Sequence, residues 1–124
     1  MLVRDLKNCE EFIAGDNCLF RELLHPDKQD VKIRYSLGQA IVKPGNITQL
    51  HKLKTSEVYY ILEGEGLMYI NEELEQVHIG QAIYIPPSAK QYIKNIGKSD
   101  LKFLCLVDPA WHKEDEEAIS EIKN

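Results

Sequence analysis

Four polar residues of this chain could do chemistry in one place: His51, Glu57, Tyr59 and Gln91. Successive side chains of a strand point to opposite faces, so His51 and Leu53 are predicted to share an inward face. The same alternation places Glu57 and Tyr59 together on the next strand, and Gln91 on the inward face of a later one. An imidazole, a carboxylate, a phenol and an amide among apolar walls are typical of a small-molecule pocket.

These groups permit two kinds of chemistry. His51, Glu57 and Gln91 offer an imidazole nitrogen, a carboxylate and an amide carbonyl, and with waters such a set suits a divalent Mn, Fe, Zn or Ni ion. Gln91 is a weak neutral ligand and Leu53 offers no donor. A metal-free pocket is therefore the alternative. There, His51 and Glu57 would bond to each other or act as acid and base, and Tyr59 would contact a ligand or only pack.

The remaining histidines and the last cysteine have weaker claims to function. His78 lies between Val77 and Ile79, so alternation points it outward. His25 precedes Pro26 and is interpreted as a turn residue. His112 lies near the start of the tail, and nothing in the sequence gives it a role. Cys105 is predicted to line the interior as an inert small hydrophobe.

Length and charge exclude several classes of protein. With 124 residues the chain suits a single domain, residues 1–124. The 20 acidic residues outnumber the 15 basic ones, for a net charge of -5, which disfavours a nucleic-acid partner. The basic pairs are spaced by two residues and are interpreted as solvated faces of strands (Lys52 with Lys54, Lys90 with Lys94).

The cysteines indicate a reducing compartment. Cys9, Cys18 and Cys105 are odd in number and lack a C-x-x-C or zinc spacing, so they are predicted to be free thiols. The first residues lack the apolar run of a signal peptide, and no apolar stretch approaches the roughly 18 residues of a membrane span. The sequence thus predicts a cytoplasmic protein with no membrane partner.

The elements that must position the polar residues are short strands. Alternating runs separated by Gly, Pro, Asn and Asp predict strands over residues 19–24, 32–37, 51–53, 58–62, 67–70, 77–79, 82–85, 92–96 and 101–107, with 9–14 open between strand and helix. After Pro109, Ala110, Trp111, Ala118, Ile119 and Ile122 are spaced for one helical face. We therefore expect an all-β jelly-roll barrel with a short C-terminal helix.

Two motifs resemble those of the cupin family. They consist of Gly45, His51, Leu53, Glu57 and Gly64, and of Gly80, Pro86, Ser88, Gln91 and Asn95. The resemblance implies a double-stranded β-helix in which two His, a Glu and a later His converge on a metal. Here His51 and Glu57 match that set, whereas Leu53 and Gln91 replace the other two histidines. It also implies a homodimer packed through sheets.

The resemblance leaves two functions open, because the family includes isomerases, epimerases, other metal-dependent enzymes and proteins that only bind. One is an enzyme acting on a small polar, sugar-like metabolite, with His51, Glu57 and Tyr59 as its catalytic residues. The other is a non-catalytic binding protein that has lost the full set of metal ligands. Both predict a small-molecule ligand.

Overall fold

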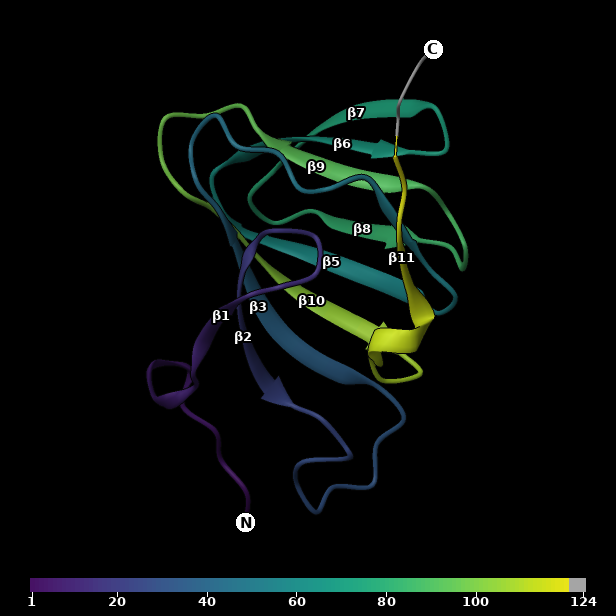
Figure 1. The fold of residues 1–124 in the computed structure, drawn as a ribbon. Helices are drawn as coiled ribbons and strands as arrows, with labels where there is room; N and C mark the ends of the chain where they lie inside the picture. The colour runs from purple at the N-terminus through teal and green to yellow at the C-terminus, as the bar shows by residue number, and fades with distance from the viewer. Residues whose placement is uncertain (121–124) are drawn as a thin grey trace.

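A computed structural model of the chain describes residues 1–120 and arranges them as two facing antiparallel sheets (Figure 1). The first sheet contains, in spatial order, β1 (Glu11–Ile13), β2 (Leu19–Leu24), β3 (Ser36–Val42), β10 (Leu101–Asp108), β5 (Ser56–Glu63) and β8 (Ala82–Ile85). The second contains β11 (Glu116–Ala118), β4 (His51–Leu53), β9 (Gln91–Asn95), β6 (Glu65–Ile70) and β7 (Glu73–His78). The chain crosses repeatedly between the sheets, so the predicted jelly roll is confirmed.

Period-two alternation builds the core between the sheets. Every second residue of β10 is buried, and these side chains meet Tyr59 and Ile61 of β5, the neighbouring strand. From the second sheet, Leu53, Met68 and Ile93 close the interior. In a closed barrel, the side chains on the inner face of each sheet fill the interior in this way.

Two motif residues have structural roles that explain their identity. Gly64 has φ +89°, and an added Cβ would lie 2.6 Å from the carbonyl oxygen of Asp100, so this turn requires glycine. Asn95 is buried and its Nδ2 donates to the carbonyls of Val42 and Ser99, both at 2.8 Å. These positions hold the barrel together at the end opposite β11.

The prediction for the strand over residues 32–37 was wrong in position and in its faces. β3 begins only at Ser36, and Ser36, Gly38 and Ala40 point inward while Leu37 is half-buried outside. The reason is the neighbouring strand: a Cβ on Gly38 would lie 2.2 Å from the ring of Phe20. Small inward residues on β3 leave room for that ring.

The predicted C-terminal helix is absent from the described part of the tail. Residues 113–115 form one 3-10 turn, η2 (Lys113–Asp115), and the next three residues form β11, which pairs with β4. The exposed edge of β4 offers unpaired backbone groups, and pairing with them outweighs the helical spacing. Ile122, part of the predicted helical face, lies outside the described residues.

Helix is scarce elsewhere too. Besides η2, the described residues contain one other helical turn, η1 (Leu6–Asn8), of three residues. It precedes β1, so the segment 9–14, which the sequence left open between strand and helix, contains a strand. Within residues 1–120 there is accordingly no helix with the length and apolar character to cross a membrane.

Candidate functional site

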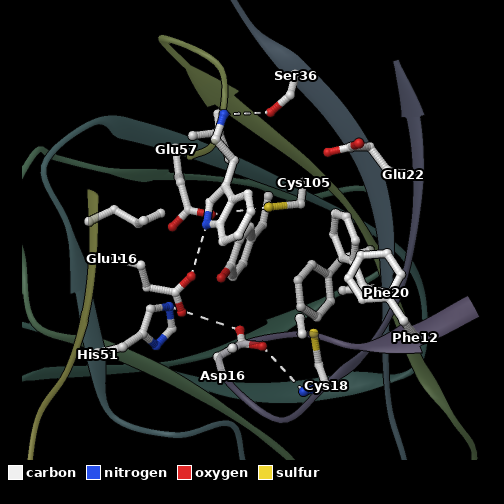
Figure 2. A pocket seen from close by; sticks show the side chains of 18 of the residues that line it. Phe12, Asp16, Cys18, Phe20, Glu22, Ser36, His51, Glu57, Cys105 and Glu116 are labelled. Atoms are coloured by element: carbon white, nitrogen blue, oxygen red, sulfur yellow. Dashed lines mark hydrogen bonds and ion pairs between the residues drawn. The ribbon is translucent and has the colours of Figure 1, made fainter. Parts of the chain in front are cut away.

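A cavity of about 100 Å³ lies between the two sheets, close to β11 (Figure 2). Its walls are aromatic and aliphatic, with several acidic groups among them. The cavity has space for a small organic molecule or a few waters. It is lined by Phe12, Ala14, Gly15, Asp16, Cys18, Phe20, Glu22, Lys28, Ser36, Ala40, His51, Leu53, Glu57, Tyr59, Phe103, Cys105, Val107, Trp111 and Glu116.

His51 presents one ring nitrogen to this cavity. It is the first residue of β4, and its Nδ1 lies 2.6 Å from the carbonyl oxygen of Gln49. A carbonyl can only accept, so Nδ1 carries the proton and a neutral ring keeps its lone pair on Nε2. This Nε2 lies 3.9 Å from Oδ2 of Asp16 (Figure 2). The ring is thus oriented as a hydrogen-bonding or proton-accepting group.

Glu57 and Tyr59 line the cavity, and each is hydrogen-bonded to Gln91. Nε2 of Gln91 donates to Oε1 of Glu57 at 2.7 Å, and the Tyr59 hydroxyl donates to Oε1 of Gln91 at 3.1 Å. The second carboxylate oxygen of Glu57 accepts from Sγ of Cys105 at 3.1 Å. All four side chains are buried, and both oxygens of the carboxylate are occupied.

Burial controls the protonation of this network. It raises the pKa of Glu57 above the usual value, although the hydrogen bonds from Cys105 and Gln91 act in the opposite direction. Burial, and secondarily the Glu57 carboxylate, raise the pKa values of Tyr59 and Cys105 far above their usual ranges. Tyr59 and Cys105 therefore stay protonated and act as donors.

The predicted ligand set does not fit a metal ion. The carbonyl of Gln91 is used by Tyr59 and its amide by Glu57, and Leu53 fills a neighbouring inward position without a donor. His51 and Glu57 alone are too few ligands for a protein metal site. Among residues 1–120, the one group of His, Cys, Asp and Glu with three ligand atoms within 4.8 Å of one another is His25, Asp27 and His112, which could hold a metal ion.

Sequence reasoning missed three acidic residues of the cavity, which are Asp16, Glu22 and Glu116. Asp16 is nearly buried, and its Oδ1 accepts the backbone N–H of Cys18. Glu116 accepts a hydrogen bond from Nε1 of Trp111 at 2.8 Å. The sequence Gly15-Asp16-Asn17 is a weak turn signal near Asp16, whereas Glu116 falls within the segment that was predicted to be helical. Its position depends on the pairing of β11, which no local pattern indicates.

The weaker candidates are placed as follows. His78 is exposed at the end of β7, as predicted. The His25 carbonyl accepts the N–H of Lys28 within a turn, also as predicted, but the side chain is buried. Cys105 lines the interior beside Phe103 as expected, yet it hydrogen-bonds to Glu57 and is not only a packing residue.

Comparisons with known proteins agree with this architecture. A family model described as "Cupin domain" matches residues 38–107. The uncharacterized protein MJ1618 of Methanocaldococcus jannaschii is 46% identical over 109 residues, covering 87% of this chain and 86% of that protein. Among solved structures, the polyketide cyclase RemF of Streptomyces resistomycificus has TM-score 0.80 at 20% identity, over 98% of this chain and 88% of RemF. A Streptomyces PAC13 variant with uridine has TM-score 0.79 at 19% identity, over 99% and 94%.

Proposed function

We propose that this chain, which belongs to the cupin family, binds a small neutral molecule rich in hydroxyl groups, of the sugar or nucleoside class, without a metal ion in the barrel. The observation that carries the proposal is the orientation of His51. Its Nδ1 is held by the Gln49 carbonyl, so Nε2 is left to accept a hydrogen bond inside an apolar cavity. Such an acceptor suits a hydroxyl group of the ligand.

The charges around the cavity select against anionic ligands. Asp16, Glu57 and Glu116 all contribute to the lining, and Lys28 is paired with Glu22 at 2.6 Å. A phosphate or carboxylate brought into this surrounding would meet uncompensated negative charge in a region of low polarity. Hydroxyl groups, in contrast, donate to carboxylates. The ligand is therefore neutral rather than phosphorylated.

Ligand-induced thermal stabilisation tests this proposal. Neutral sugars and nucleosides, uridine among them, are compared with their phosphate esters on the wild-type protein, on His51→Ala and on His78→Ala. We expect some neutral compounds to raise Tm in the wild type and in His78→Ala, the exposed matched control, and not in His51→Ala. Stabilisation by the phosphorylated forms alone, or a full response of His51→Ala, would contradict the proposal.

An acid–base enzyme is the second candidate function. Nε2 of His51 and the Asp16 carboxylate are 3.9 Å apart at the cavity, close enough to share a substrate proton between them. An isomerase or epimerase working this way exchanges a substrate C–H with solvent. Once a ligand is found, incorporation of deuterium from D₂O, observed by NMR and lost in His51→Ala, supports catalysis. Its absence leaves binding as the function.

The protein is further proposed to be a cytoplasmic homodimer that associates through the first sheet. Tyr60, Leu62 and Tyr84 are 43%, 39% and 63% exposed on the outer faces of β5 and β8. Leu104 and Leu106 of the adjacent β10 lie half-buried on the same face. A continuous apolar surface across three strands is typical of an interface between subunits.

A further inference from the structure

A second group of chemically capable side chains lies outside the barrel interior. His25 and Asp27 belong to the turn that follows β2, whereas His112 follows β10. Although 85 residues separate Asp27 from His112, Nε2 of His112 lies 2.7 Å from Oδ2 of Asp27. The rings of the two histidines are 5.4 Å apart at their centres and nearly perpendicular. The fold thus joins two histidines and a carboxylate from two distant segments.

His25 is held in the orientation of a metal ligand. Its side chain is 4% exposed, and its Nε2 lies 2.7 Å from the carbonyl oxygen of Trp111, to which it must donate. The lone pair is therefore on Nδ1, which faces the Asp27 carboxylate at 3.9 Å. Histidines that bind metals in proteins commonly donate their other N–H to a backbone carbonyl in this way.

We propose that His25 Nδ1, Asp27 Oδ2 and His112 Nε2 bind a divalent transition-metal ion of the Zn²⁺ type. Two imidazoles and one carboxylate are a ligand set that zinc accepts with a water in the fourth position. Tetrahedral coordination separates ligand atoms by about 3.3 Å. The distances from Asp27 Oδ2, 2.7 Å to His112 and 3.9 Å to His25, bracket that value.

Binding requires two exchanges of contacts. His112 Nε2 must give up the proton that it now donates to Asp27 Oδ2 at 2.7 Å, so that both atoms can bind the ion. Nδ1 of His25 now accepts the backbone N–H of Asp27 at 3.1 Å, and a metal ion would take over that lone pair. Asp27 is exposed, so its freed N–H turns to water at little cost. The other ligands are accessible, since the side chains of His112 and Asp27 are 42% and 61% exposed.

The site would fix one side of the cavity. Lys28 and Trp111, each adjacent in sequence to a ligand, both line it. A bound ion would tie the turn after β2 to the segment after β10. This site shares no ligand with His51 and Glu57, and its test is independent of the function proposed for the barrel.

Calorimetric titration with Zn²⁺ tests the site on tag-free protein stripped by EDTA and dialysed. We expect one ion per chain in the wild type, with affinity at least about tenfold lower in His112→Ala and in Asp27→Asn. His78→Ala is the matched exposed-histidine control and should bind as the wild type does. Both substituted ligands are exposed, so the variants should fold, which near-ultraviolet circular dichroism checks.

Two results would overturn the proposal. One is the absence of Zn²⁺ binding to the wild type at micromolar concentration, which would leave Asp27 and His112 as a simple surface ion pair. The other is binding that persists in both ligand variants and is lost in His51→Ala, which would place the ion in the barrel. Co²⁺ provides a second readout, since its visible absorption reports tetrahedral coordination by the wild type and should be lost in His112→Ala.

Discussion

Gln91 Nε2 donates a 2.7 Å hydrogen bond to Oε1 of Glu57, at a position where the cupin pattern would supply a metal-binding histidine. The amide N–H of Gln91 thus gives the Glu57 carboxylate oxygen a hydrogen bond in the place where a metal ion would give it a positive charge. Its own carbonyl is satisfied in turn by the hydroxyl of Tyr59. The Glu57, Gln91 and Tyr59 side chains are therefore satisfied by hydrogen bonds without a metal.

Replacing Gln91 by Leu should destabilise the protein by about 3 kcal/mol, because it leaves a buried carboxylate oxygen and the Tyr59 hydroxyl without partners. Urea unfolding measures the loss. Gln76→Leu, at an exposed position of β7, is the control and should change stability by less than about 0.5 kcal/mol. Equal effects of the two substitutions would mean that the network contributes nothing.

Glu57→Gln should become increasingly stabilising, relative to the wild type, as pH rises above 4.5, the usual pKa of a glutamate. Because the pKa of Glu57 is higher in the folded chain, the folded state binds more protons than the unfolded one, and wild-type stability falls as pH rises through the raised value. Urea unfolding at several pH values measures the difference. A difference between Glu57→Gln and the wild type that stays flat across this pH range would contradict the raised pKa.

The double variant Leu53→His, Gln91→His should gain a metal site in the barrel. Leu53 and His51 of β4 both point into the barrel. Gln91 of β9 lies directly opposite His51 in the antiparallel pair of β4 and β9. Calorimetry with Ni²⁺ or Zn²⁺ should show a new site, measured in a His112→Ala background to exclude the external cluster. Failure to gain affinity would mean that the barrel has lost more than these two ligands.

Light scattering at micromolar concentration should give twice the chain mass of 14.3 kDa. Tyr84→Glu, on the exposed apolar face of the first sheet, should shift the protein toward the monomer by placing a charge in the interface. Leu74→Glu, at a position 57% exposed on β7 of the other sheet, should leave the mass unchanged. A wild-type monomer would refute the dimer.

All three cysteines should titrate as free thiols in the denatured, unreduced chain, since each is buried and unpaired in the structure. In the native protein the reaction should be slow. Burial raises the pKa values of Cys18 and Cys105, so the reactive thiolate is scarce. Rapid reaction with a disulfide reagent before denaturation would show that the cavity opens readily.

Local patterns predicted the strands well where alternation was clear. Residues 19–24, 51–53 and 82–85 were predicted with the bounds that the structure has. β3 was misplaced because the burial of Gly38 depends on the ring of Phe20 from another strand. The terminal segment failed for a related reason, since its strand forms only against the free edge of β4.

The site was predictable in its residue types but not in its contacts. Alternation placed His51, Glu57 and Tyr59 at one cavity, and the structure brings them there. That the amide of Gln91 is bonded to Glu57, and that Asp16 lies beside His51, depends on segments distant in sequence. The association of Asp27 with His112 has the same origin.

The pairing of β11 with β4, the strand that carries His51, is short. Ala118 lies opposite His51, and beyond that three-residue ladder β4 has a single paired position on β9. The strand that carries His51 is thus anchored far less firmly than its neighbours. Detaching the tail would uncover the imidazole while the rest of the barrel stays folded. Amide exchange of β11 and β4 would then be faster than global unfolding allows, and the proposed ligand would enter through this local opening.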